Sequence, residues 1–363
     1  MKFLAMTLIT HTPDPVTGVW PTQHERFTEV VENATLAEQW GFDAYGVGER
    51  HERPFLSSSP TVVLSNIAAR TSRIKLFTTV TTLSLLDPVR AYEDYATLDH
   101  LADGRLELIV GKGNGAAQAN LFHVTTDDQW DRNAEGYELF RRLWREEQVT
   151  WQGRFRPSLD RAETWPAPYQ RDLRIWHGSA TSEESVEVAA AAGDPLFSAN
   201  VTYPIDTYAR LVEHYRERWA AHGHDPADAL VGAGSAGSFV ARTSQEARRV
   251  WRPHFEARQK AFAGSGVPAV WEDFEDFLAR SSALVGSPEE VVDKVGRYHA
   301  RFGHEVTALH FDRSGFSEAQ HRENWDLFTT DVAPVLRRQF PSRPLVPAPA
   351  QAQGRAPLVP AAS

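Results

Sequence analysis

The sequence predicts a closed (β/α)8 barrel with insertions. Short runs rich in β-branched and apolar residues alternate with amphipathic runs, a pattern typical of βα units around a parallel sheet. There are eight such runs, the strand number of a closed barrel, and a chain of 363 residues with 42% apolar content can bury that core as one domain over residues 1–340. The expected strands are Lys2–Thr10, Asp43–Glu49, Ile74–Val80, Arg105–Gly111, Leu173–His177, Pro195–Asn200, Val231–Ala241 and Thr307–Asp312.

Helix-start signals support the same alternation. A side-chain oxygen that can act as N-cap precedes a proline at three places, and Ser287 with Glu290 also has the spacing of a capping box. The three pairs are Ser59-Pro60, Asp87-Pro88 and Ser287-Pro288. The expected helices are 24–40, 60–70, 88–101, 128–145, 182–192, 206–222, 244–260 and 287–302.

Residues 261–286 form an insertion before the last predicted βα unit. The segment begins with two glycines and a proline and continues with large apolar residues at helical spacing. We expect a lid that closes over the barrel mouth, with the glycines as pivots. The alternative is a helix packed permanently on the barrel or on a partner subunit, because Trp and Phe at this spacing are often core residues. The residues concerned are Gly264, Gly266, Pro268, Val270, Trp271, Phe274 and Phe277.

Two further segments depart from the alternating pattern. Residues 146–172 contain three prolines and are an excursion between two barrel units. Residues 341–363 form a Pro/Ala-rich tail with few large apolar groups, so burial cannot offset the entropic cost of ordering it and we expect disorder.

Composition excludes several classes of protein. The chain has no cysteine, which rules out disulfides, thiolate metal sites and a cysteine nucleophile, and no metal site is expected. A formal net charge of −10 argues against a nucleic-acid surface. The N-terminal apolar stretch is short and lacks a small-residue cleavage site, and no run approaches the roughly 20 apolar residues of a membrane span. These features indicate a cytoplasmic protein.

The first candidate site is the stretch GVGERHERPFLSSSP at residues 46–60. Glu49 and His51 come where the second predicted strand ends, and barrel enzymes place their working residues at the carboxyl ends of strands. Histidine is the side chain whose charge changes most readily near neutral pH. The alternative is a surface ion pair between Glu49 and Arg50 or Arg53, with His51 as a bystander.

The second candidate site follows the fourth predicted strand. Gly111, Gly113 and Gly115 let a ligand approach the backbone, and Lys112 places a cation among them. This spacing is neither a dinucleotide fingerprint nor a Walker loop, and turn geometry alone also explains the glycines.

The third candidate site is the stretch IWHGSATSEES. A predicted strand ends at His177-Gly178, and Ser179, Thr181 and Ser182 lead into a helix whose first N–H groups favour an anion. A phosphate site is one interpretation, because barrels often bind phosphate between a late strand and a helix N-terminus. Ordinary serine N-capping is the other.

Together, and in this order, these motifs resemble the bacterial luciferase-like flavin-dependent monooxygenases, a family of (β/α)8 proteins. The resemblance extends from Met1 to about Phe340. Three stretches carry it, and the second is the most specific: GFDAYGVGERH, SSPTVVLSNIAARTSRIKLFTTVTTLSLLDPVRAYEDYATLDHLADGRLELIVGKG and PYQRDLRIWHGSATSEESVEVAAAAGDPLFSA.

The resemblance implies roles for particular residues. Glu49 and His51 match catalytic positions beside the reacting edge of the flavin, but the position of the histidine regarded as catalytic in luciferase is Arg50, which argues against light emission. The third strand is expected to end against the isoalloxazine, often with a non-proline cis peptide in this family. The basic position and the serines are expected to hold the flavin phosphate. The implied cofactor-binding set is Thr78, Thr79, Val80, Lys112, Gly113, His177, Gly178, Ser179 and Ser182.

The resemblance also implies a reaction. The expected activity is that of a reduced-FMN-dependent monooxygenase, which oxidises a small, largely apolar organic substrate with molecular oxygen through a flavin C4a-peroxide. A separate flavin reductase is expected, because the chain has no nicotinamide fingerprint. A homodimer or homotetramer, formed through helices near the second and third βα units, is expected from the family. The alternatives are a deazaflavin-dependent hydride-transfer dehydrogenase and a non-catalytic flavin-binding protein.

Overall fold

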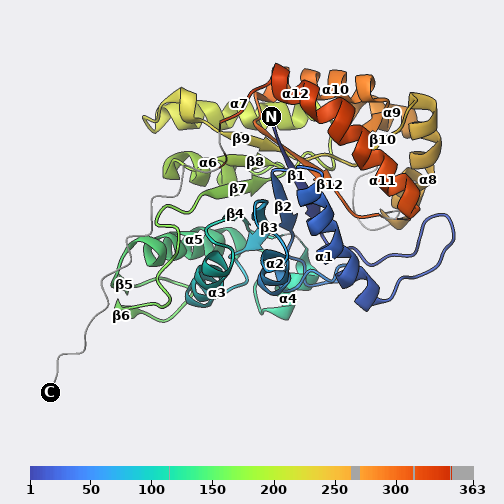
Figure 1. The fold of residues 1–363 in the computed structure, drawn as a ribbon. Helices are drawn as coiled ribbons and strands as arrows, with labels where there is room; N and C mark the ends of the chain where they lie inside the picture. The colour runs from blue at the N-terminus through green and yellow to red at the C-terminus, as the bar shows by residue number, and fades with distance from the viewer. Residues whose placement is uncertain (114, 263–269, 314, 344, 346–363) are drawn as a thin grey trace.

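The computed structural model of the protein contains a closed barrel of eight parallel strands (Figure 1). The structure describes residues 1–113, 115–262, 270–313, 315–343 and 345. Around the barrel the strands follow the order β1-β12-β9-β8-β7-β4-β3-β2, so the first and last strands close it. Each of the eight predicted strands overlaps one of the barrel strands. They are β1 Lys2–Thr7, β2 Ala44–Val47, β3 Lys75–Thr82, β4 Leu106–Gly111, β7 Ile175–Ser179, β8 Leu196–Ser198, β9 Val231–Ala233 and β12 Val306–His310.

Helices surround the barrel, with α2, α3 and α5 on one side of the strands and α7, α10 and α12 on the other (Figure 1). The eight predicted helices are confirmed with small shifts at their ends: α1 Gln23–Gln39, α2 Pro60–Ala68, α3 Pro88–Leu101, α5 Gln129–Arg145, α6 Glu183–Ala192, α7 Ile205–Ala221, α8 Ser244–Phe262 and α10 Pro288–Phe302. Further helical segments are α4 Ala116–Leu121, α9 Phe274–Arg280, α11 Glu318–Leu327 and α12 Ala333–Gln339, with a 3-10 turn at Pro226–Asp228 and a π segment at Phe328–Val332.

Alternation along the strands divides the core into two layers. Large side chains at one set of positions fill the barrel interior, among them Phe77, Ile109 and Trp176. Their neighbours Leu76 and Leu108 point outward and pack with the helices. The interior cluster ends in the partly buried side chains of Met6 and Val80, which come late in their strands. The carboxyl end of the barrel therefore has an apolar floor that neighbouring side chains cover only in part.

The seventh predicted strand, Val231–Ala241, is wrong as a single strand. The barrel strand β9 ends at Ala233, and the chain then leaves the barrel to form β10 Ser238–Val240, which pairs in parallel with β11 Leu284–Gly286. Gly237 lies between them with φ +144°, and a Cβ there would lie 2.3 Å from the Trp251 ring. The turn needs a residue without a side chain, which apolar content alone does not indicate.

The predicted caps are partly correct. The Asp87 carboxylate accepts hydrogen bonds from the first turn of α3, and Ser287 Oγ accepts one from Glu290 N–H at 3.4 Å. The Ser59 cap is wrong, because with φ −138° and ψ 71° its hydroxyl does not bond to the start of α2. The reciprocal half of the Ser287 capping box is also missing, since the Glu290 carboxylate instead pairs with Arg248 of α8 at 2.7 Å.

The described part of the 261–286 insertion packs against α8. Phe274 and Phe277 of α9 are 2% and 1% exposed, and the Phe277 ring stacks on Trp251 with centroids 5.8 Å apart. Trp271 meets Phe277 edge-on at 5.5 Å. These contacts are those of the packed-helix alternative. Gly264, Gly266 and Pro268 lie outside the described residues, so the lid remains a prediction.

The other two irregular segments have defined contacts. The 146–172 excursion contains an antiparallel pair, β5 Val149–Trp151 and β6 Leu159–Ala162. Most of the predicted disordered tail, residues 344 and 346–363, lies outside the described residues. Two described residues of the predicted tail have partners. Arg343 pairs with Glu305 at 2.7 Å, and Leu345, which is 7% exposed, belongs to the barrel-interior cluster. Packed contacts thus continue past the predicted boundary at residue 340, because a cation and an apolar side chain find partners at the barrel.

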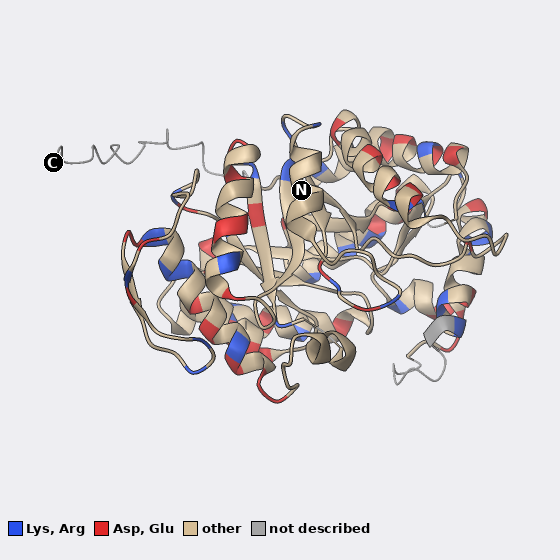
Figure 2. Ribbon diagram, turned by 90° about the horizontal axis from the view of Figure 1, so that it is seen from below, with Lys and Arg blue, Asp and Glu red and all other residues tan. Residues whose placement is uncertain are grey.

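Opposite charges are interleaved along the outer helices (Figure 2). Pairs one turn apart, such as Arg142 with Glu146 at 2.8 Å and Arg322 with Glu318 at 3.1 Å, account for several of them. Among the helices of the described chain, none has the length and apolar content needed to cross a membrane.

Candidate active site

Glu49 and His51 form one unit after the end of β2. Glu49 is 4% exposed, and its Oε1 lies 3.0 Å from Nε2 of His51. The other carboxylate oxygen accepts the backbone N–H of Thr82, at the end of β3, at 3.2 Å. The His51 ring also meets Phe122 edge-on, with centroids 4.6 Å apart. Glu49 therefore joins two strand ends and orients the imidazole between them.

Arg50 is turned to a different set of partners. Its guanidinium pairs with Glu52 and lies 4.5 Å over the Phe55 ring. The alternative ion pair of Glu49 with Arg50 or Arg53 is not found among the described residues, where Glu49 binds His51 instead. The luciferase histidine is thus replaced by an ion-paired side chain, and His51 is the imidazole bound to Glu49.

The end of β3 provides the apolar floor of the mouth. The Thr79–Val80 peptide is cis, and the pairing of β3 with β4 shifts register between Thr79 and Thr81. The Val80 side chain fills space left by two glycines: a Cβ would lie 2.8 Å from it at Gly178 and 3.3 Å at Gly111. Val80 thus leaves no room for a side chain at Gly178 and only a tight fit for one at Gly111. Thr78 faces the other way, and its hydroxyl binds the Ile109 carbonyl at 3.2 Å.

Buried polar atoms without partners gather beside this floor. The hydroxyls of Thr79 and Thr82 and the amide of Gln118 take no hydrogen bond from any described residue. Gly113, with φ +78°, lies against two of them, since a Cβ there would be 2.5 Å from Thr82 and 2.6 Å from Gln118. Buried polar groups are nearly always paired, so these atoms can bond to a polar ligand or to water at the carboxyl end of the barrel.

Lys112 lies at the same end, just after β4. Its Nζ lies 5.3 Å from the centre of the Trp130 ring and 3.4 Å from the Gly113 carbonyl oxygen. Burial lowers the pKa of Lys112, while the nearby Glu184 carboxylate raises it. The ammonium is thus held in a partly dry place close to the start of α6.

The serines form a closed arrangement at the start of α6. Ser182 Oγ accepts the Ser185 N–H at 3.2 Å, so the predicted N-cap is confirmed. Ser179 Oγ accepts the Ser182 N–H at 3.1 Å. The Ser182 hydroxyl also donates to the Glu184 carboxylate at 2.8 Å. Backbone and Ser182 hydrogen bonds, and then the Lys112 charge, lower the pKa of Glu184. A carboxylate thus lies where the motif predicts a phosphate.

His177 points away from the barrel mouth. Its neighbours Trp176 and Gly178 face the barrel interior, so alternation turns His177 outward. The ring is 1% exposed, lies 3.1 Å from an Asp194 oxygen and meets the Tyr137 ring at 4.6 Å. Its side chain connects β7 to the helix layer, and only its backbone lies near the predicted phosphate site.

Several residues at the mouth have no counterpart in the sequence-based predictions. Gln118, Phe122 and Trp130 come from helices or loops after β4, and no motif marks them. His310 was detectable, because it lies within the last predicted strand near its carboxyl end. The rule that barrel enzymes use the carboxyl ends of strands would have selected it.

Comparison with known proteins gives one family. The chain matches the luciferase-like monooxygenase family over residues 1–305. Limonene 1,2-monooxygenase from Rhodococcus erythropolis is 26% identical over 307 residues, which make up 82% of this chain and 78% of that protein. Monooxygenase RslO1 from Streptomyces bottropensis has a solved structure with a TM-score of 0.81 and 27% identity, covering 92% of this chain and 99% of that chain.

Other similarities are more distant or shorter. The oxygenating constituent of 3,6-diketocamphane monooxygenase from Pseudomonas putida, solved in complex with FMN, has a TM-score of 0.74 and 18% identity over 92% of this chain and 98% of that chain. At this identity it shows the fold alone. An uncharacterized protein from Sinorhizobium fredii is matched over 38% of its length, and uncharacterized proteins from Mycobacterium bovis and Mycobacterium tuberculosis over 62%.

Proposed function

Because this chain belongs to the luciferase-like monooxygenase family, we propose that it is a reduced-FMN-dependent monooxygenase that oxidises a small, largely apolar organic substrate with molecular oxygen. One observation carries the proposal. Lys112 and the start of α6 meet at the β4–β7 edge of the mouth, on the same barrel end as the Glu49–His51 pair. A phosphate anchor and an acid–base pair on one apolar floor are what a flavin enzyme needs.

The residues at the mouth fit FMN. The unpaired hydroxyls of Thr79 and Thr82 and the amide of Gln118 suit the polar edge of an isoalloxazine, and Val80 suits its apolar face. The Lys112 ammonium and the α6 N-terminus suit one terminal phosphate. One cation and one helix N-terminus suit a single terminal phosphate better than the long acidic tail of a deazaflavin, which favours FMN over that alternative.

The chain's own residues have distinct tasks in this reaction. When bound, reduced FMN would supply the chemistry that activates oxygen. His51 would give a proton to, or take one from, the reacting oxygen, and Glu49 would hold its ring in place through the hydrogen bond at 3.0 Å. Met6 and Val80 keep water from the flavin face. A separate flavin reductase would supply the reduced cofactor.

Oxygen incorporation tests the proposed function. The protein is supplied with reduced FMN by a flavin reductase and NADH under isotopically labelled oxygen, with limonene and cyclohexanone as probe substrates. Incorporation of one labelled oxygen atom into either probe is expected. Quantitative release of hydrogen peroxide that no probe diminishes points instead to a flavin-binding protein without oxygenase activity. Anaerobic titration with a reduced deazaflavin tests the remaining alternative.

The double variant Lys112→Ala/Ser179→Ala is expected to weaken FMN binding by roughly 2–4 kcal/mol, because it removes a cation and a hydroxyl from a dianionic phosphate. Riboflavin has no phosphate, so its binding should change far less. Both affinities are measured by quenching of flavin fluorescence.

Glu184→Gln is the matched control for this variant. It removes the carboxylate that now bonds to the Ser182 hydroxyl and attracts Lys112, and FMN binding should therefore strengthen or stay unchanged. Equal losses for FMN and riboflavin in the double variant contradict the phosphate assignment.

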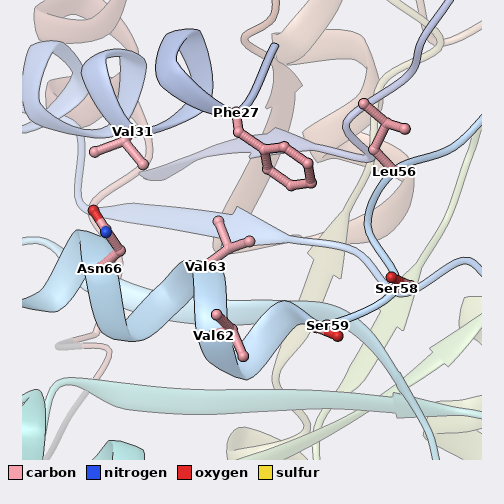
Figure 3. Close-up of a pocket in the computed structure, with 8 residues that line it drawn as sticks. All are labelled: Phe27, Val31, Leu56, Ser58, Ser59, Val62, Val63 and Asn66. Carbon is pink, nitrogen blue, oxygen red and sulfur yellow. The ribbon is translucent and has the colours of Figure 1, made fainter. Parts of the chain in front are cut away.

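A second copy of the chain is the proposed partner. An apolar hollow of about 290 Å³ lies between α1 and α2, outside the barrel, and Figure 3 shows its side chains coming from both helices and the segment before α2. Phe27 and Val62 on its rim are 37% and 68% exposed. Exposed apolar patches of this kind often mark interfaces. The hollow is lined by Phe27, Val31, Leu56, Ser58, Ser59, Val62, Val63 and Asn66.

Val62→Lys is expected to shift the protein from a dimer or tetramer to the monomer, because it places a charge in the proposed interface. Sedimentation velocity measures the mass. Leu121→Lys in α4, where the leucine is 63% exposed, is the control and should leave the assembly unchanged. An unaltered mass for Val62→Lys removes this hollow as the interface.

A further inference from the structure

A second polar cluster lies at the barrel mouth, at the ends of β8, β9 and β12. Its central residue is His310, the last residue of β12. Val306 and Ala308 belong to the barrel-interior cluster and Leu309 to the outer layer, so alternation turns His310 toward the interior. In the register of the β1–β12 pair, His310 lies opposite Met6 on the apolar floor. No described residue forms a hydrogen bond with its ring.

Arg258 of α8 reaches the same place. Its guanidinium donates to the Ala236 carbonyl at 3.3 Å and to the Val201 carbonyl at 3.0 Å, in the loops after β9 and β8. Burial, and then the Arg258 charge, lower the pKa of His310 to about 4, so the imidazole is neutral near pH 7. The cluster therefore combines one fixed cation with a neutral imidazole.

Two unpaired polar groups complete the cluster. Asn200 is 1% exposed; its Oδ1 accepts the Ser198 hydroxyl at 2.7 Å, but its Nδ2 has no partner among the described residues. Ser235, 2% exposed, likewise has an unpaired hydroxyl. The Ser282 hydroxyl bonds to the Asn200 carbonyl and accepts the Ala236 N–H at 2.8 Å, which connects these two loops. A buried donor without an acceptor costs about 1–3 kcal/mol unless a ligand or water satisfies it.

We propose that Arg258, His310 and Asn200 form a subsite for an acceptor oxygen, a carboxylate or a carbonyl, at one end of an otherwise apolar substrate. This inference rests on the proposed function and deepens it, because it adds one oxygen group to the substrate class. His310 ends β12, which lies across the barrel from β4 and Lys112, whereas Asn200 follows β8, the neighbour of the β7 strand that ends in Ser179. A substrate held there by its oxygen would extend over the Met6 and Val80 floor toward the flavin. Arg258 and His310 are thus specificity-determining residues.

The test compares three probes of similar shape: cyclohexanecarboxylate, acetylcyclohexane and ethylcyclohexane. Binding is measured by tryptophan fluorescence, with and without oxidised FMN. The wild-type protein should bind the two oxygen-bearing probes more tightly than the hydrocarbon. Arg258→Gln should weaken binding of cyclohexanecarboxylate roughly ten- to hundredfold and leave the affinity for ethylcyclohexane unchanged. Arg258→Lys should restore most of the affinity for the carboxylate. His310→Leu should weaken binding of both oxygen-bearing probes by roughly two- to tenfold.

Arg252→Gln is the matched control, because Arg252 lies on the same helix and pairs with Glu275 on the surface at 2.9 Å. It should leave all three affinities unchanged. Equal losses for the three probes in Arg258→Gln, or no wild-type preference for the oxygen-bearing probes, overturn the subsite. If Arg258→Gln does not fold, His310→Leu decides by the same comparison. FMN binding is followed separately: its absence removes the proposed function, while carboxylate selectivity without FMN still supports the subsite.

Discussion

A His51→Ala variant is expected to bind FMN almost normally and to lose about 10²–10⁴-fold in turnover, the usual contribution of a general acid–base group. The imidazole bonds to Glu49 and meets Phe122, and neither residue belongs to the phosphate site. Removing it should therefore affect the chemical step more than cofactor affinity. Oxygen that no longer reaches the substrate should appear as hydrogen peroxide, so product and peroxide are measured together per NADH consumed.

His24→Ala is the control for this variant, since His24 is an exposed residue of α1. It should keep the wild-type ratio of product to peroxide. Wild-type turnover in His51→Ala would make His51 a bystander. A parallel loss of FMN affinity would instead give it a binding role.

An Arg26→Met variant is expected to lose about 3–5 kcal/mol of folding free energy, because it leaves buried carboxylates without their cation. Arg26 is 5% exposed, pairs with Glu29, lies 3.2 Å from Asp312 and donates to the Thr10 carbonyl at 3.1 Å. Asp312 also accepts the Thr7 hydroxyl at 2.8 Å. The network thus joins the start of α1 to the ends of β1 and β12. Urea denaturation followed by tryptophan fluorescence measures the loss.

Arg313→Met is the matched control, because this arginine also faces Glu29, at 3.5 Å, but its side chain is 39% exposed. Solvent screens such a pair, and a loss below about 1 kcal/mol is expected. Burial raises the pKa of Asp312 even with Arg26 present, so acid should reduce the difference between Arg26→Met and wild type as the carboxylates take up protons. Equal losses for the two arginine variants would show that the buried network adds nothing beyond a surface pair.

The candidate site was only partly predictable. Glu49, Lys112 and Ser179 could be assigned to the barrel mouth because each lies at the end of a strand or within two residues of it, and parallel strands bring their carboxyl ends together. Which partner each side chain takes was not predictable. Glu49 pairs with His51 and not with the neighbouring arginines, and the Glu184 carboxylate bonds to Ser182, where a phosphate was predicted. Those choices depend on distances between loops that the sequence does not encode locally.

The sequence by itself determined the eight barrel strands, the eight helices between and around them, and the family, because alternation, capping residues and motifs are local properties of the chain. Only the tertiary structure decided that His177 faces the helices, that His310 faces the barrel mouth and that β9 stops at Ala233. The sequence of a strand shows that successive side chains point to opposite faces. Closure of the barrel determines which of the two sets faces inward. Packing between elements, such as Trp251 of α8 against Gly237, favours the turn that separates β9 from β10.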